Sequence, residues 1–161
     1  MSSDGAPESL HGLDGKGLRF GIVAARFHQE IVDRLLEGSL TTFQQHGVAA
    51  EDILSVRVPG AWEIPLAVQA MMSRGDLDGV VALGVVIRGE TPHFDFICAE
   101  CSAQCAEIAV RSGRPVGFGL LTCETRGQAD ARSGGAAGNK GEEAALACLE
   151  MTAALRSISK S

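Results

Sequence analysis

The sequence predicts an α/β fold, a three-layer sandwich in which a four-stranded parallel sheet carries helices on both faces. Short apolar runs of strand length alternate along the chain with longer segments whose apolar residues recur at helical spacing. The clearest run, Gly79–Ile87 (GVVALGVVI), is apolar throughout, which is typical of a strand buried on both faces. Strands that alternate with helices are joined by right-handed crossovers, so neighbouring strands run parallel.

The first half of the chain contains two strand–helix pairs. We predict strands over Arg19–Ala25 and Ile53–Val58. Helices are predicted over His28–His46 and Trp62–Arg74, and Pro65 is tolerated in the second because it falls in the first turn.

After the central strand the alternation continues. A helix is predicted over Pro92–Arg111, with Thr91 as its N-cap and Pro92 at the first helical position. A fourth strand is predicted over Val116–Leu121.

The last part of the chain is predicted to be helical around a glycine-rich link, Gly134–Gly138. Thr125 and Gln128 have the spacing of a capping box, which opens a short helix to about Arg132. The final helix has one apolar face, formed by Ala145, Cys148, Leu149, Thr152 and Leu155.

Length and charge indicate the number of domains and exclude some classes of binding partner. The 161 residues favour one α/β domain over 18–161, preceded by a flexible N-terminal arm, 1–17, that is poor in large apolar groups. The net charge of -6, without a dense Lys/Arg cluster, argues against nucleic acid or an anionic membrane as partner. The longest apolar run is too short to span a bilayer, and the first residues do not form a secretion signal. We therefore expect a cytoplasmic location.

The five cysteines do not predict a disulfide framework, because their number is odd and the expected compartment is reducing. Cys98, Cys101 and Cys105 hint at a metal site, but no second CxxC or histidine pair completes a tetrahedral zinc centre. Ile97, Cys101 and Cys105 share one helical stripe, so core packing is favoured over metal binding.

Polar and aromatic residues collect where the predicted strands end, and ligands of open parallel sheets bind beyond the carboxyl ends of the strands. Gly89, Glu90 and Thr91 open a helix whose free N–H groups suit a phosphate, although many such turns hold no ligand. His93, in the first turn, is either an acid–base group beside that anion or a helix-end histidine bonded locally.

Four other candidate residues have a structural interpretation as well as, or in place of, a functional one. Phe27 either stacks on a flat heterocycle or seals the sheet edge, and Trp62 either lines a pocket or packs, with Glu63 beside it as an acceptor. By pattern alone Phe118 belongs to the core, and Arg132 is either a solvated charge or a bidentate phosphate donor. No phosphate-binding P-loop, dinucleotide fingerprint or serine-hydrolase elbow is present.

Four motifs together resemble lumazine synthase, the penultimate enzyme of riboflavin biosynthesis. They are GAWEIP at 60–65, ALGVVIRGETPHFD at 82–95, GFGLLT at 117–122 and GNKG at 138–141. The likeness runs in order from about Phe20 to Leu155. It implies a flavodoxin-like version of the predicted sheet. It also implies a cofactor-independent transferase that condenses 5-amino-6-(D-ribitylamino)uracil with 3,4-dihydroxy-2-butanone 4-phosphate, giving 6,7-dimethyl-8-ribityllumazine, phosphate and water.

The resemblance also implies a role for each candidate residue. The catalytic residue is His93, and the phosphate is held by Glu90, Thr91 and Arg132. The residues expected to bind the uracil substrate are Phe27, Ala61, Trp62, Glu63, Val85, Val86, Ile87 and Phe118, the last from a neighbouring subunit. No metal is expected. The sequence departs from the commonest family pattern at His28, where asparagine is frequent, and at the bulky Trp62, and the role of Lys140 stays open.

The resemblance further implies homopentamers with active sites at the subunit interfaces. The compact link at 133–140 resembles members that form icosahedral shells, so sixty subunits are favoured over a lone pentamer. Whether riboflavin synthase sits inside such a shell is left open. Two rival functions are an archaeal-type riboflavin synthase and a non-catalytic shell protein that binds lumazine or flavin.

Overall fold

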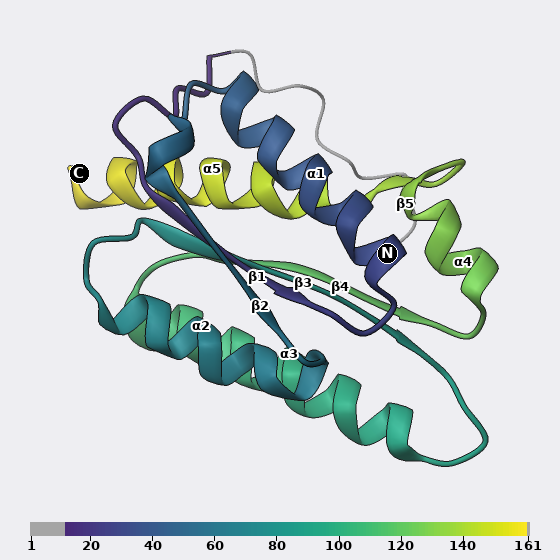
Figure 1. Ribbon diagram of the computed structural model, residues 1–161. Helices are drawn as coiled ribbons and strands as arrows, with labels where there is room; N and C mark the ends of the chain where they lie inside the picture. The colour runs from purple at the N-terminus through teal and green to yellow at the C-terminus, as the bar shows by residue number, and fades with distance from the viewer. Residues whose placement is uncertain (1–11, 161) are drawn as a thin grey trace.

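The computed structural model describes residues 12–160 and has the predicted three-layer α/β architecture (Figure 1). The central sheet has the strand order β2-β1-β3-β4, and every pair in it is parallel. Its strands are β1 (Phe20–Ala25), β2 (Ile53–Val58), β3 (Gly79–Ile87) and β4 (Val116–Cys123). This flavodoxin-like arrangement confirms the predicted fold.

Helices cover both faces of the sheet (Figure 1). On one face lie α2 (Ile64–Ser73) and α3 (His93–Ser112), and on the other lie α1 (Gln29–Gln45) and α5 (Lys140–Ser159). The short α4 (Arg126–Ala131) follows β4 at the carboxyl edge of the sheet. Consecutive crossovers therefore bring the ends of β1, β2 and β3 to one side of the molecule.

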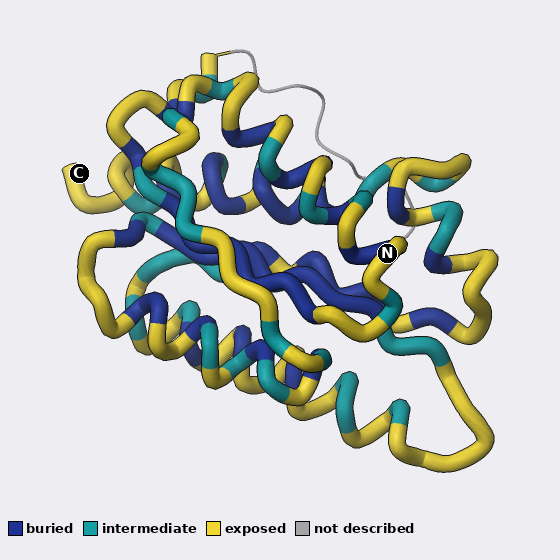
Figure 2. The backbone as a smooth tube through the Cα atoms, in the orientation of Figure 1, coloured by how far each residue is buried: buried dark blue, intermediate teal, exposed yellow. Residues whose placement is uncertain are grey.

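The core consists of two apolar clusters, one on each face of the sheet. Residues 79–85 of β3 are all buried, so this strand contributes to both clusters (Figure 2). On the α1–α5 face the rings of Phe20 and Phe43 stack with centroids 4.5 Å apart. Burial on both faces explains why the sequence of β3 is uniformly apolar.

The two middle strands of the chain, β2 and β3, begin and end where predicted, whereas several helix ends differ. A 3-10 turn, Ala61–Glu63, precedes α2, so the strand end and the helix are separated by a short bend. The N-cap of α3 is Pro92 rather than Thr91, and no side chain caps the helix there. The prediction for Thr91 is therefore wrong by one position, because the Pro92 carbonyl accepts the first helical hydrogen bonds, from the N–H groups of Asp95 and Phe96.

The glycine-rich link forms a hairpin that was not predicted. Residues Ser133–Gly135 (β5) pair in antiparallel fashion with Gly138–Asn139 (β6). The predicted N-cap Thr125 is confirmed, since its hydroxyl accepts a hydrogen bond from the Gln128 N–H at 3.2 Å.

Helices α1 and α5 approach one another closely at Gly141. A Cβ atom at this position would overlap the carbonyl oxygen of Leu35. The Asn139 side chain accepts hydrogen bonds from the N–H groups of Gly141 (2.8 Å) and Glu142 (3.2 Å) and donates one to the Arg34 carbonyl (3.1 Å). The GNKG motif thus caps α5 and fixes its contact with α1.

Residues 12–17, the described part of the predicted arm, lie against the domain. Leu13 packs on the core, and the N–H of the buried Gly15 donates to the His46 carbonyl at 2.6 Å. Residues 1–11 lie outside the described part of the chain, so the boundary of the arm stays a prediction. Among the described helices, none has both the length and the apolar composition needed to cross a membrane.

Candidate active site

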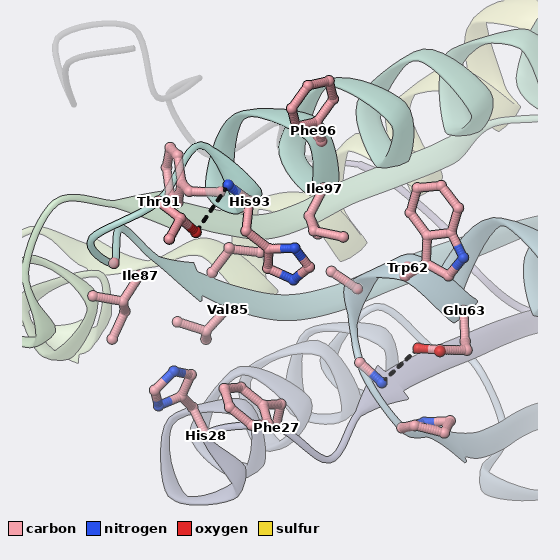
Figure 3. A pocket seen from close by; sticks show the side chains of 16 residues that line it. Phe27, His28, Trp62, Glu63, Val85, Ile87, Thr91, His93, Phe96 and Ile97 are labelled. Carbon is pink, nitrogen blue, oxygen red and sulfur yellow. Dashed lines mark hydrogen bonds between the residues drawn. The ribbon is translucent and has the colours of Figure 1, made fainter.

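A cavity of about 870 Å³ opens at the carboxyl ends of β1, β2 and β3 (Figure 3). This volume lies within the range of small-molecule sites. It is lined by Phe27, His28, Pro59, Gly60, Ala61, Trp62, Glu63, Val85, Val86, Ile87, Gly89, Thr91, His93, Phe94, Phe96 and Ile97. Nine of the predicted site residues are in this set, drawn from three separate strand–helix junctions.

The junction after β1 supplies an aromatic wall. Phe27 is 67% exposed, although it follows a fully buried strand. The His28 ring stands edge-on to it, with centroids 4.8 Å apart, and the His28 backbone is left-handed (φ 57°). Burial lowers the pKa of His28, and the positive charge of Arg126 lowers it further. His28 therefore presents a neutral imidazole next to an open aromatic face at neutral pH.

The junction after β2 supplies Trp62 and Glu63, which lie together on one side of the cavity (Figure 3). One carboxylate oxygen of Glu63, Oε2, accepts a hydrogen bond from the Gly60 N–H at 3.0 Å. This bond holds the short turn Ala61–Glu63 against the strand end. Among the described residues, no group donates a hydrogen bond to the other carboxylate oxygen, Oε1.

The junction after β3 forms the floor and the far wall. Val85, Val86 and Ile87 line the cavity. The His93 ring projects from the start of α3 toward Phe27 and His28 (Figure 3). The His93 N–H lies 3.4 Å from the Thr91 hydroxyl oxygen.

The loop between β3 and α3 exposes backbone donors. Within the described residues, no protein group accepts a hydrogen bond from the N–H of Gly89, Glu90 or Thr91. A Cβ atom on Gly89 would meet no other described group within 4 Å. Unpaired N–H groups and open space at the start of a 20-residue helix make this loop suitable for an anion.

Three predicted site residues do not line the cavity of the single chain. Glu90 is exposed on the loop, and Arg132 is exposed at the end of α4, where it donates to the Gln128 carbonyl at 3.1 Å. The positive charge of Arg132 is nevertheless close enough to lower the pKa of Cys123, which burial raises overall. Arg132 therefore lies near the carboxyl end of β4, beside the end of β3.

Phe118 lies away from the cavity, on the edge strand β4. Its neighbours Gly117 and Gly119 face α5, so Phe118 faces the opposite side of the sheet, where it is 39% exposed. The sequence pattern places Phe118 in the core, but the side chain is open to contact from outside the chain.

Sequence reasoning assigned no role in the site to Phe94, Phe96 and Ile97, and left that of His28 open. The three residues on α3 belong to its first turns, and the only signal for them was their closeness to His93. His28 was noticeable as a departure from the family pattern, but its left-handed conformation, which aims it at the cavity, depends on the tertiary structure.

Among the described residues, no cluster of three or more His, Cys, Asp or Glu side chains is arranged to hold a metal ion. Cys101 and Cys105 are buried in the core, as their helical spacing predicted. Burial raises the pKa of Cys98 and raises that of Cys148 to about 12, so both thiols stay protonated at neutral pH.

Comparison with known proteins assigns the family. A sequence model of 6,7-dimethyl-8-ribityllumazine synthase matches residues 17–156. The chain belongs to the 6,7-dimethyl-8-ribityllumazine synthase family. The lumazine synthase of Desulfovibrio desulfuricans is 52% identical over 138 residues, which cover 86% of this chain and 88% of the relative.

Further relatives agree. The lumazine synthase of Aquifex aeolicus is 48% identical over 146 residues, 91% of this chain and 95% of that protein. The enzyme of Nitratidesulfovibrio vulgaris is 52% identical over 138 residues, 86% of this chain and 88% of that protein. Lumazine synthase activity, a transferase activity of riboflavin biosynthesis, is accordingly the function of this chain, as its motifs predicted.

Proposed function

We propose that the cavity binds 5-amino-6-(D-ribitylamino)uracil and 3,4-dihydroxy-2-butanone 4-phosphate side by side and condenses them to 6,7-dimethyl-8-ribityllumazine, phosphate and water. The observation that carries this proposal is the meeting of three features in one cavity. They are the open face of Phe27, the unpaired N–H groups at the start of α3 and the imidazole of His93. A flat ring, an anion and a proton donor or acceptor are what this condensation requires.

The uracil ring stacks on Phe27, whose face is open to the cavity. The backbone of Val85, Val86 and Ile87 borders the same space and offers hydrogen bonds to the uracil edge. The ribityl chain extends past Ala61 and Trp62 toward the free oxygen of Glu63, a natural acceptor for its hydroxyl groups.

The phosphate of the butanone substrate binds at the loop formed by Gly89, Glu90 and Thr91. Backbone N–H groups and the Thr91 hydroxyl serve as donors, with the helix dipole of α3 behind them. Arg132 joins them from the end of α4. Within the described residues its guanidinium makes one hydrogen bond, so donors stay available for a bidentate contact with phosphate.

His93 stands between the two substrate sites and moves protons during imine formation, phosphate loss and ring closure. The amine is already nucleophilic and the butanone already carries its leaving group, so positioning contributes the larger share of catalysis, several kcal/mol. The expected contribution of one acid–base group is about 10²–10⁴-fold. No cofactor or metal enters this scheme.

The complete site needs a second chain. Members of the family are generally homo-oligomeric, and the exposed Phe118 of an edge strand is suited to close the neighbour's cavity. We propose homopentamers that assemble further into a sixty-subunit icosahedral shell, because the compact link at 133–140, which contains the β5–β6 hairpin, resembles that of shell-forming members. Sedimentation should give a particle of sixty chains, and a particle of five chains would reject the shell. Enclosed riboflavin synthase and a cytoplasmic location stay predictions.

Mixing the purified protein with both substrates and following lumazine fluorescence tests the proposed reaction. Product should form only when both substrates are present, with one phosphate released per lumazine. Riboflavin formation from lumazine alone would instead identify a riboflavin synthase. Tight lumazine binding without turnover of the two substrates would identify a non-catalytic binding protein.

A further inference from the structure

Arg88, the residue after β3, lies outside the cavity lining but makes a dense set of contacts behind it. Its Nε donates to both carboxylate oxygens of Glu124, at 3.1 and 2.9 Å. Its two terminal nitrogens face the two oxygens of Asp95, each at 3.0 Å. The guanidinium also lies 4.3 Å from the centroid of the Phe94 ring.

These contacts join the two ends of the anion loop. Arg88 immediately precedes Gly89, whereas Asp95 lies in the first turn of α3, just after the loop. The N–H of Arg88 also donates to the Cys123 carbonyl at 2.9 Å, and Glu124 follows Cys123 at the end of β4. One guanidinium therefore links the start of the loop, the end of the loop and the neighbouring strand end.

The bridge contributes little to global folding. The side chains of Arg88, Asp95 and Glu124 are 37%, 57% and 59% exposed, and ion pairs at such exposure are weak. Hydrogen bonds from Arg88 lower the pKa of Asp95 and so favour the charged form of this carboxylate. Its effect should be local, on the shape of the loop that it closes.

We propose that Arg88 is a positioning residue that holds the loop Gly89–Pro92 with its N–H groups directed into the cavity and keeps His93 in line with them. The inference rests on the proposed binding of the butanone phosphate at this loop. Donors that are already directed lose less freedom when an anion binds, so affinity and alignment both improve. Arg88 acts through the loop and touches no substrate.

A rival explanation is that Arg88 attracts phosphate by its charge alone. The geometry argues against it, because its nitrogens face two carboxylates, so Arg88, Asp95 and Glu124 together carry a net negative charge. The two explanations predict opposite effects for the carboxylates. Removing the charge of Asp95 or Glu124 would strengthen simple attraction of phosphate, but it would loosen the bridge.

Steady-state kinetics of four variants distinguish a positioning role of Arg88 from simple charge attraction. Arg88→Gln should raise the KM for the butanone phosphate about tenfold and lower kcat, with the KM for the uracil substrate changed less than about twofold. Arg88→Lys should not restore the wild-type KM, because an ammonium group cannot hold both carboxylates in the planar, forked geometry. Asp95→Asn and Glu124→Gln should each raise the same KM about threefold.

The matched control is Arg111→Gln, which removes an equal charge from the far end of α3, where Arg111 pairs with Glu107 at 2.9 Å. Its constants should stay within about twofold of wild type. Rescue by Arg88→Lys, or a lower KM in Asp95→Asn or Glu124→Gln, would overturn the positioning role in favour of charge attraction.

Amide hydrogen exchange of the unliganded protein tests the bridge without turnover. The N–H groups of Asp95 and Phe96, hydrogen bonded to the Pro92 carbonyl, and that of Arg88 should exchange several-fold faster in Arg88→Gln than in Arg111→Gln. Equal exchange in the two variants would overturn the inference whatever their activity. If wild type made no lumazine, the proposed function would fail, and this exchange comparison would still decide whether Arg88 orders the loop.

Discussion

Two glycine motifs carry much of the family likeness, and the structure uses them in opposite ways. Gly89 stands in open space beside the cavity, where the described neighbours leave room for a ligand. Gly141 is buried where α5 meets α1, and no atom larger than hydrogen fits against the Leu35 carbonyl. The first glycine leaves space for a substrate, whereas the second removes space between two helices.

The contrast extends to the polar neighbours of each glycine. Around Gly141 they are satisfied within the chain, since Asn139 caps α5 and the Ser39 hydroxyl donates to the Gly141 carbonyl at 2.7 Å. The N–H groups of Gly89, Glu90 and Thr91, by contrast, have no protein acceptor in the described chain. A motif typical of an enzyme family can thus serve packing as readily as chemistry. The two cases are distinguished by whether the polar groups of the motif already have hydrogen-bond partners within the chain.

The largest effect is expected from Gly141→Ala. A methyl group there overlaps backbone atoms of α1, so the helices must separate, which we expect to cost more than about 3 kcal/mol. For a domain of this size the thermal midpoint should fall by roughly 6–12 °C. Thermal unfolding at matched protein concentration measures it, with Gly89→Ala as the control, expected within about 2 °C of wild type. Similar thermal midpoints for the two variants would contradict the proposed difference between the packed Gly141 and the open Gly89.

Removing the imidazole of His93 tests the catalytic role of the cavity beside Gly89. His93→Ala should lower kcat about 10²-fold, near the lower end for one acid–base group, because positioning of the two substrates is retained. Affinity for the uracil substrate should stay nearly unchanged, since Phe27 and Glu63 are intact. Single-turnover kinetics and equilibrium titration give the two quantities. Unchanged turnover would remove His93 from the mechanism.

Arg132→Ala tests the phosphate end of the same region. Loss of a charge-assisted contact should raise the KM for the butanone phosphate about 10–30-fold, with a much smaller change for the uracil substrate. Steady-state kinetics with each substrate varied in turn make the measurement. Equal losses for the two substrates would contradict the assigned role of Arg132.

The smallest expected effect concerns His28, a strained residue in the open region. His28→Asn should stabilise the protein by up to about 1 kcal/mol at neutral pH, because asparagine adopts the left-handed conformation more readily. The pKa of His28 is lower in the folded chain, so the unfolded chain binds more protons as pH falls below about 6.5 and wild type loses stability there.

The stability difference between the two proteins should therefore widen on acidification. Denaturation curves at pH 7.5 and pH 5.5 test it, with His46→Asn as a matched control, since His46 ends α1 away from the cavity. A difference that stays constant across pH would show that His28 contributes strain alone.

The sequence was most informative where burial follows a simple pattern. The strand Gly79–Ile87 is predicted to the residue because a short, uniformly apolar run is typical of a strand covered on both faces. The hairpin of β5 and β6 escaped prediction, since it depends on left-handed glycines at 134 and 138 and has no apolar periodicity. The N-cap of α3 lies one residue later than predicted, at Pro92, whose carbonyl accepts the first helical hydrogen bonds.

Nine predicted site residues meet in one cavity, largely because the carboxyl ends of parallel strands share one edge. Their assigned roles stay predictions until tested. The role of Phe118 could not be inferred from the pattern of one chain, because its exposed side chain is proposed to act in the cavity of a second chain. The Arg88 bridge was equally hidden, because Glu124 is 36 positions away along the chain and only the pairing of β3 with β4 brings it near.

The central strand also limits how this enzyme can be redesigned. Val85 belongs to the core and to the cavity floor at once, whereas Phe27, Trp62 and Phe96 stand at the solvent edge. Substituting Val85 to enlarge the cavity would therefore reduce the free energy of unfolding. Substituting the exposed residues Phe27, Trp62 and Phe96 would reshape the cavity entrance without that cost. Variant libraries for substrates with bulkier heterocycles or shorter polyol chains should therefore vary these entrance residues.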